Sequence, residues 1–235
     1  MTHTLIKSQT RGQANHGWLK SNFSFSFADY YDPSRMNFES LRVINDDWIA
    51  PGAGFPAHPH RDAEIFSYVL SGTIEHKDSL GNGSRVGAGG VQYMSAGSGV
   101  RHSEFNPDAD NALEILQVWL LPNVSGAAPR YDTLELSEAD KRGKLKLFLS
   151  EDGREGAMSI RQDADIYAGL FDGKESASLT LRRGRRGYIH MARGAAVVNG
   201  TTLSRGDALT VDSGEIKIEN GEGAELLLFD LAPLK

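Results

Sequence analysis

Hydrophobic and polar residues alternate along this chain over short stretches that end at glycine-containing turns. Residues 23–27 (Phe-Ser-Phe-Ser-Phe) alternate strictly between aromatic and polar side chains, which is typical of a half-buried β-strand. Further candidate strands cover residues 64–70, 73–78 and 91–94. A longer run at 113–121 is of the kind found at the centre of a sheet. Strands that recur every ~8–12 residues between turns predict a β-sandwich or β-barrel.

A change of pattern between residues 122 and 146 divides the chain. Residues 126–129 (Gly-Ala-Ala-Pro) resemble a linker, and Ser137 opens a short stretch with the sequence of a capped helix. The earlier order of strands and turns then returns with a period of about 120 residues. We therefore expect an all-β fold with two tandem β-barrel domains. The expected divisions are a domain at 1–122, a linker with a short helix at 123–146, and a domain at 147–235.

Two pairs of metal-capable side chains occur in the first of these domains. His58 and His60 form one pair, and His102 and Glu104 form the other, with a single residue between the members of each. Alternate side chains of a β-strand point to the same face, so each pair would present both groups together. Two neighbouring strands would then bring three imidazoles and one carboxylate to a divalent ion.

Each of these residues also has an ordinary structural explanation. His58 and His60 would be exposed residues after a turn, and Glu104 would be a charged residue at the end of a strand. The metal interpretation is favoured because it explains both spaced pairs at once. The remaining histidines are expected to be solvated or hydrogen-bonded structural residues: His3, His16, His76 and His190.

The types of the candidate ligands limit the possible metal ions to several. The chain contains no cysteine, which excludes disulfides and thiolate metal sites. A structural zinc site would usually include cysteine and would be closed by four ligands. A set of imidazoles with one carboxylate suits Fe(II), Mn, Ni, Cu or Zn, and leaves positions free on an octahedral ion.

Composition and net charge exclude some classes of binding partner. The chain is 40% hydrophobic and 24% charged, as expected for a globular protein with a substantial core. A formal net charge of -6 argues against general affinity for nucleic acid or anionic membranes. No apolar run approaches the ~20 residues that span a bilayer, and residues 1–8 lack a signal-like apolar core, so a cytoplasmic protein is expected. The basic residues 182–186 are interpreted as a solvated loop, with docking to an anionic partner as the alternative.

Two motifs resemble those of the cupin superfamily. They are Gly52-x5-His58-x-His60-x3-Glu64-x7-Gly72 and Gly97-x-Gly99-x2-His102-x3-Asn106. More closely, five segments resemble the pirin family, in particular its bacterial quercetin 2,3-dioxygenase members: residues 25–28, 31–33, 41–47, 58–64 and 101–104. The resemblance spans nearly the whole chain and implies a bicupin of two double-stranded β-helix barrels. It places the metal site only in the N-terminal barrel, because the degenerate C-terminal barrel keeps only His190.

The resemblance also selects the carboxylate ligand. General cupins use a glutamate at the position of Glu64, whereas pirins carry one two residues after the third histidine, which is Glu104 here. The expected metal ligands are therefore His58, His60, His102 and Glu104. Glu64 is expected to be a supporting or structural residue. Fe(II) is the expected ion, with Mn, Ni, Cu, Co and Zn as alternatives.

The implied activity is that of a quercetin 2,3-dioxygenase, which opens the ring of a flavonol with O2 and releases CO. Glu104 would take the proton of the flavonol 3-hydroxyl. An apolar pocket is expected to include Phe55, Phe66, Met94 and Phe105. The expected partners are a flavonol-like molecule and O2, without direct nucleic-acid or membrane contact, and the protein is expected to be a monomer. One alternative is a metal-binding, redox-sensing regulator that acts through protein partners; another is the same chemistry on a different substrate.

Overall fold

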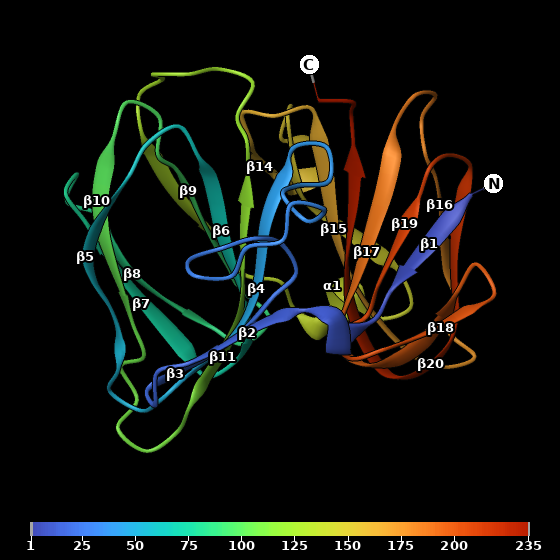
Figure 1. The fold of residues 1–235 in the computed structure, drawn as a ribbon, viewed down its shortest axis with the longest axis horizontal. Coiled ribbons are helices and arrows are strands. Elements are labelled where there is room, and N and C mark those ends of the chain that lie inside the picture. Colours follow the sequence, from blue (N-terminus) through green and yellow to red (C-terminus); the bar gives the residue numbers. More distant parts are fainter. Residues whose placement is uncertain (1, 235) are drawn as a thin grey trace. The chain divides into compact units, whose positions relative to one another are not determined.

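The regular secondary structure of the chain is almost entirely β-strand in a computed structural model that describes residues 2–234 (Figure 1). The strands form two compact units. The N-terminal unit comprises residues 11–37 and 41–136, and the C-terminal unit comprises residues 2–10, 38–40 and 137–234. The all-β class predicted from the alternating pattern is confirmed. Across residues 2–234, no helix is both long enough and apolar enough to cross a bilayer.

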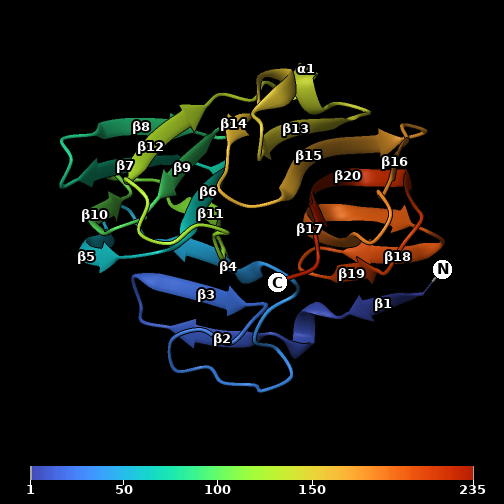
Figure 2. The same ribbon diagram turned by 90° about the horizontal axis from the view of Figure 1, so that it is seen from above.

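The N-terminal unit contains two antiparallel sheets. The larger has the strand order β12-β9-β6-β11-β4-β3-β2, and the smaller has the order β5-β10-β7-β8. The larger sheet consists of β2 (Gly12–Asn15), β3 (Leu19–Phe23), β4 (Leu41–Ile49), β6 (Glu64–Ser71), β9 (Val91–Ser95), β11 (Leu113–Leu120) and β12 (Arg130–Leu134). The smaller consists of β5 (Gly54–His60), β7 (Thr73–Asp78), β8 (Gly83–Gly87) and β10 (Val100–Phe105), which lie together at the left of Figure 2.

Apolar side chains from both sheets meet inside the N-terminal unit. Leu19 and Ile49 come from β3 and β4 of the larger sheet, and Ile74 comes from β7 of the smaller one. Ile49 and Ile74 have no exposed surface. Burying a side chain of this size stabilises the fold by about 1.5–3 kcal/mol. The two sheets therefore close on a shared interior, as in a barrel.

The aromatic-polar alternation at residues 23–27 is only partly a strand. β3 ends at Phe23, and the chain then turns, with reciprocal backbone hydrogen bonds of 3.0 Å between Phe27 and Tyr30. Ala28 lies inside this turn with a φ of 49°, a left-handed conformation that ends the extended run. The rings of Phe23 and Phe27 still lie 5.7 Å apart, so both remain on the same side of the unit.

The C-terminal unit contains one nine-stranded sheet. Its main order is β1-β19-β17-β20-β15-β13-β14, with β16 beside β20 and β18 beside β17. The strands are β1 (His3–Ile6), β13 (Leu145–Ser150), β14 (Met158–Ser159), β15 (Ala164–Gly173), β16 (Ala177–Thr180), β17 (Arg186–Val198), β18 (Thr201–Ser204), β19 (Ala208–Val211) and β20 (Glu215–Leu231). The helical turns are η1 (Ser8–Thr10), α1 (Glu138–Lys141) and η2 (Arg154–Gly156). Ser137 caps α1 through its side chain and the backbone of Asp140, as the sequence predicts.

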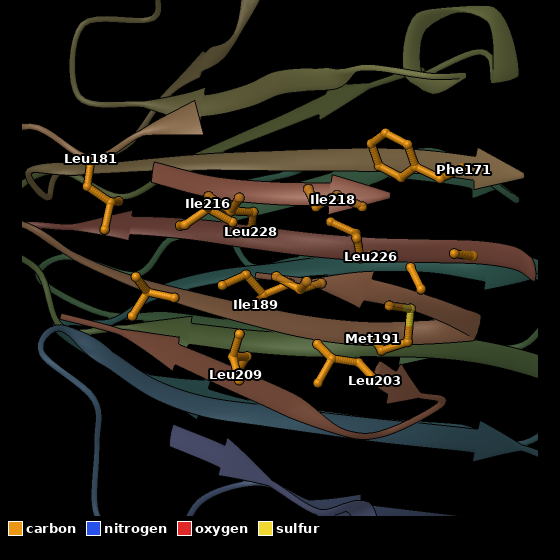
Figure 3. Packing of buried hydrophobic residues seen from close by; sticks show 14 residues of the cluster. Phe171, Leu181, Ile189, Met191, Leu203, Leu209, Ile216, Ile218, Leu226 and Leu228 are labelled. Carbon is orange, nitrogen blue, oxygen red and sulfur yellow. The ribbon is translucent and has the colours of Figure 1, made fainter. Parts of the chain in front are cut away.

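The core of this unit is built from alternate residues of its long strands. Ile189 and Met191 on β17 share one face, as do Leu226 and Leu228 on β20, and all four are fully buried. Figure 3 shows these side chains converging in one cluster with Phe171 from β15. The apolar runs that the sequence shows in this region thus form the inner face of a closed sheet.

The first strand of the chain belongs to the C-terminal unit. β1 pairs antiparallel with β19, with Ile6 opposite Ala208. The Lys7 ammonium also bonds the Asp207 carboxylate at 2.8 Å. The division expected from the sequence placed residues 1–10 with the N-terminal domain, but these backbone and ionic contacts join residues 3–7 to the other unit. Residue 1 lies outside the described residues, and the boundaries at 122 and 146 stay predictions.

Candidate metal centre

Antiparallel pairing of β5 with β10 brings the two predicted side-chain pairs together. His102 lies directly opposite His58, and Val100 lies opposite His60. His58 and His60 are both less exposed than Pro59 between them, as expected when alternate residues face the interior. Along β10, His102 and Glu104 are both buried. The two strands therefore present all four side chains inward.

Two glycines allow the strands to approach in this way. A Cβ atom on Gly54 would lie 2.3 Å from the backbone oxygen of Glu104, so only glycine permits this contact beside the bulge between His102 and Glu104. Gly97 has a φ of 46° in the turn before β10, where a Cβ atom would meet the Ala127 carbonyl. Both glycines help to set the register that places His102 opposite His58.

Three imidazoles form a compact group. One ring nitrogen from each of His58, His60 and His102 lies within 4.8 Å of the others. The Nε2 atoms of His58 and His102 are 3.1 Å apart. Two nitrogen ligands at about 2.1 Å from one ion and at right angles to each other would be separated by about 3 Å, so this spacing fits a shared transition metal.

Hydrogen bonds select the His58 tautomer that binds a metal. The Nδ1 atom of His58 lies 2.8 Å from the Pro56 carbonyl oxygen. Because a carbonyl only accepts hydrogen bonds, Nδ1 must carry the proton and Nε2 keeps its lone pair. That lone pair belongs to the nitrogen that faces His102.

A second chain of hydrogen bonds orients His102. Its Nδ1 atom lies 3.4 Å from Nδ1 of His76, whose Nε2 lies 3.2 Å from Oδ2 of Asp78. Burial acts to raise the pKa of Asp78, but hydrogen bonds from Asn82 and His76 hold it below its usual value, so the carboxylate accepts. His76 therefore donates through Nε2 and accepts through Nδ1 from His102. This leaves the lone pair of His102 Nε2 facing His58.

Glu104 lies among donors from the larger sheet. Its Oε1 accepts hydrogen bonds from the Ser67 hydroxyl at 3.2 Å and from the Gln92 amide, and its Oε2 accepts from the Gln117 amide at 3.0 Å. Within the described residues, Glu104 groups with His76 and His102 as possible metal ligands, and not with His58 and His60. The structure thus brings the predicted carboxylate to the centre but holds it by amides on one side of His102.

Burial favours the uncharged form of two of the imidazoles, His60 and His102. Burial, followed by the neighbouring His58, lowers the pKa of His60 to about 4. The same two causes lower the pKa of His102 to about 2. Both rings are uncharged at neutral pH, which is the form that coordinates metals. Burial raises the pKa of Glu104 to about 7, against the opposing hydrogen bonds from Ser67, Gln117 and Gln92.

A largely aromatic pocket of about 480 Å³ opens beside the imidazoles. His58 and His60 form part of its wall, and Trp119 meets His60 edge-on with ring centroids 4.8 Å apart. The other aromatic members are Phe23, Phe27, Phe55 and His16. All of its lining residues belong to the N-terminal unit. The pocket has the size and the apolar lining of a small-molecule site.

The predicted pocket residues are only partly those observed. Phe55 lines this pocket, whereas Phe66 and Met94 line a separate cavity of about 10 Å³ next to Glu104 and His76. Within the described residues, Phe105 lines neither cavity. The alternation of side chains along a strand shows which residues point inward. It does not show which part of the interior each of them reaches. The aromatic alternation at 23–27 was the available signal for Phe23 and Phe27.

Glu64, the ligand position of general cupins, is occupied by other partners. Its carboxylate accepts hydrogen bonds from the Ser95 hydroxyl at 2.6 Å and from the Tyr93 hydroxyl. Arg130 donates to the same Tyr93 oxygen at 3.2 Å. Glu64 is absent from both ligand groups among the described residues. Its contacts are those of a residue that joins β6 to β9.

Three of the four arginines in residues 182–186 form ion pairs within the C-terminal unit, while residues 182–184 are exposed as the sequence suggested. Arg185 is buried and bonds Asp230 at 2.6 Å, so it is not solvated as the sequence suggested. Arg182 bonds Asp165 at 3.2 Å, and Arg186 bonds Asp212 at 2.7 Å. Carboxylates thus accompany Arg182, Arg185 and Arg186, which argues against a docking patch for an anionic partner.

Comparison with known proteins places this site in a family. The Pirin family model matches residues 6–120, and the model of the quercetinase C-terminal cupin domain matches residues 147–231. Quercetin 2,3-dioxygenase of Escherichia coli (strain K12) is 45% identical over 98% of this chain and 99% of that protein. A pirin-like protein of Caulobacter vibrioides is 44% identical over 94% of this chain and 96% of that protein. The crystal structure of the E. coli bacterial pirin YhhW in complex with nickel(II) matches with a TM-score of 0.93 and 44% identity, and covers 99% of this chain and 100% of that one.

Two cupin domains, the first with a buried group of imidazoles, define this protein as a bicupin. The chain belongs to the pirin family. The family resemblance and the two-cupin fold expected from the sequence motifs are therefore confirmed. Both ligand groups found among residues 2–234 lie in the N-terminal unit. The restriction of metal binding to that unit stays a prediction.

Proposed function

We propose that this chain is a metal-dependent dioxygenase of the quercetin 2,3-dioxygenase type, which opens the ring of a flavonol with O2 and releases CO. The proposal depends above all on one observation: His58 and His60 form part of the wall of an aromatic pocket of about 480 Å³. Small-molecule sites typically enclose ~300–1,000 Å³. The name of the E. coli relative, quercetin 2,3-dioxygenase, supports a dioxygenase.

The proposed metal ligands are His58, His60, His102 and Glu104. The three imidazoles already lie close enough to share an ion, and Glu104 would join them by a rotation that releases an amide partner. A bound transition metal would supply Lewis acidity toward the flavonol 3-hydroxyl and redox chemistry toward O2. Fe(II) is the proposed ion, with Mn, Ni, Cu, Co and Zn as alternatives that the same donors accept. The relative YhhW was crystallised with nickel(II).

Glu104 is the proposed catalytic base. In the metal-free protein, burial raises the pKa of Glu104 to about 7. A carboxylate oxygen that the ion leaves free would take the proton of the 3-hydroxyl. Gln92, which donates to Oε1, would hold the carboxylate in place from the opposite sheet. Phe23, Phe27 and Trp119 would pack against the flavonol rings and keep water away from the flavonolate.

The structure supports an enzyme more than a regulator that acts through partner proteins. A regulator needs an exposed docking surface, whereas His58 and His60 line an apolar pocket. The arginines that were the candidate docking patch are paired with carboxylates of their own unit. The same metal chemistry could act on another aromatic substrate. An assay of flavonol cleavage distinguishes that activity from the proposed one.

The proposal includes a monomeric cytoplasmic protein whose reactants are a flavonol-like molecule and O2. Neither nucleic acid nor a membrane is proposed as a partner. A net charge of -6 supports this, because anionic surfaces would repel the chain.

Replacement of one ligand tests the site. His60→Ala removes an imidazole that lies 4.8 Å from His102 between ring centroids, and we expect the variant to lose its metal and its flavonol turnover together. His3→Ala, at an exposed histidine of the C-terminal unit, is the matched control. Normal metal content and turnover in His60→Ala would refute the assignment.

A further inference from the structure

A row of polar side chains crosses the larger sheet of the N-terminal unit in register. Gln92 on β9 lies opposite Ser67 on β6, Ser67 lies opposite Gln117 on β11, and Gln117 lies opposite Asn45 on β4. Asp47 follows two residues after Asn45 on the same face of β4. Polar residues at successive inward positions of a sheet are costly unless they have partners. Each member of the row should therefore have a specific role.

The residues at one end of the row serve as hydrogen-bond donors to Glu104. The side chains of Gln92, Ser67 and Gln117 all donate hydrogen bonds to its carboxylate. The other end is not explained in this way. Asn45 and Asp47 line the aromatic pocket instead, together with Gln117 and Ser21.

Asn45 and Asp47 each carry a buried oxygen that lacks a partner. Both residues are only 2% exposed, and their Oδ1 atoms make no hydrogen bond among the described residues. Asp47 does accept a hydrogen bond from the Ser21 side chain on the neighbouring strand. A buried acceptor without a partner destabilises the fold, which is a reason to expect a ligand that supplies a donor.

We propose that Asn45, Asp47 and Ser21 form a recognition site for a hydroxyl group of the bound aromatic ligand, separate from the hydroxyl that reacts at the histidines. This inference rests on the proposed function, since it concerns the same pocket. Oδ1 of Asn45 and the ionised carboxylate of Asp47 are both acceptors, so the ligand group that pairs with them must be a hydrogen-bond donor. A phenolic hydroxyl meets this requirement, whereas a hydrogen atom or a methyl ether at the same position does not.

The surrounding wall explains why such a contact would discriminate. Phe23 lies opposite Asn45 on the neighbouring strand and lines the pocket, as do Leu19 and Phe27. These apolar side chains provide no competing donor and exclude water. The terminal torsions of Asn and Asp side chains are soft, so a small rotation brings an oxygen to the pocket surface when a donor arrives. A ligand without the hydroxyl leaves the oxygens unpaired, and a site of this kind rejects it.

The test compares two flavonols on matched variants. Both compounds carry the 3-hydroxyl that reacts. Quercetin has further hydroxyl groups, whereas 3-hydroxyflavone has no other. The selectivity is the ratio of their kcat/KM values, measured with metal-loaded protein. Asp47→Leu replaces the carboxylate with an apolar group of similar size, and Asp47→Asn keeps an acceptor oxygen. Leu19→Ala alters the same pocket without touching a polar group.

We expect the wild-type protein to prefer quercetin and Asp47→Leu to reduce this preference at least tenfold. Asp47→Asn should retain the preference within about threefold, and Leu19→Ala should affect both compounds alike. If Asp47→Leu does not fold, Asn45→Leu and Ser21→Ala carry the same expectation with a smaller loss. Metal content and the thermal midpoint of each variant show whether it is folded. An unchanged selectivity in folded, active variants would overturn the inference and leave the proposed function intact.

A binding measurement separates the two claims when turnover is absent. Quenching of tryptophan fluorescence under anaerobic conditions reports occupancy, because Trp119 lines the pocket. Tighter binding of quercetin than of 3-hydroxyflavone, lost in Asp47→Leu, would support the recognition site even if metal-loaded protein cleaved neither compound. Equal binding of both compounds, or no binding of either, would overturn it.

Discussion

The Nδ1 atoms of His102 and His76 lie 3.4 Å apart, and His76 in turn contacts Asp78. All three side chains are buried, and Tyr131 stacks on His76 with ring centroids 4.0 Å apart. This chain of contacts determines which nitrogen of His102 keeps its lone pair. The candidate metal centre is therefore supported by residues that do not touch the metal themselves.

Removal of the His76 nitrogens should weaken metal binding. His76→Phe keeps an aromatic ring against Tyr131 but cannot accept the proton from His102, so we expect metal affinity to fall about 10–100-fold. Affinity is measured by competition with a chromogenic chelator, which is independent of catalysis. His3→Phe serves as the control. Unchanged affinity in His76→Phe would mean that His102 is oriented by its backbone and packing alone.

Truncation of Trp119 should damage substrate binding more than metal binding. The indole meets both His60 and Phe27 edge-on, with ring centroids 4.8 Å and 5.6 Å away. In Trp119→Ala we expect kcat/KM for a flavonol to fall at least tenfold, mostly through KM, because the lost ring contributes pocket wall. Metal content should stay near that of the wild type. A large fall in kcat with unchanged KM would indicate that Trp119 acts on the reaction step instead.

Asp47 should make the stability of the metal-free protein depend on pH. Burial, with Asp46 and Glu104 adding to it, raises the pKa of Asp47 from about 3.8 to about 7 in the folded state. A raised pKa stabilises the fold below the unfolded pKa, and this contribution disappears as pH rises through about 7. The difference corresponds to about 4 kcal/mol at most.

Asp47→Asn isolates this contribution. The wild type should lose free energy of unfolding relative to Asp47→Asn as pH rises from about 4 to about 7, measured by urea denaturation after metal removal. His60 and His102 have lowered pKa values, so they reduce the free energy of unfolding as pH falls below about 6.5. This opposite trend is present in both proteins and cancels when their free energies of unfolding are subtracted. Parallel pH profiles for the two proteins would show that Asp47 is not desolvated.

The sequence predicted the positions that depend on strand periodicity. His58 and His60, like His102 and Glu104, are separated by one residue, and this spacing suffices to place each pair on one face. The partners of Glu104 could not be predicted in the same way. Ser67, Gln92 and Gln117 reach it from the opposite sheet, and their alignment depends on the register between strands that are distant in sequence.

Other differences have the same origin. Asp47 lies in an Asn-Asp-Asp run, and the sequence does not show that the pocket lies on its face of the sheet. The pairing of β1 with β19 joins residues about 200 positions apart, which no local pattern reveals. His76 resembles any other isolated histidine until the fold places it behind His102. Long-range pairing, and not local propensity, determines these features.

Flavonol cleavage with metal analysis tests the central proposal most directly. The purified protein is analysed for transition metals and then incubated with quercetin under air, while O2 uptake and CO release are recorded. We predict close to one transition-metal ion per chain, and one CO released for each flavonol and each O2 consumed. A protein that carries its metal but consumes no O2 and releases no CO would contradict the account.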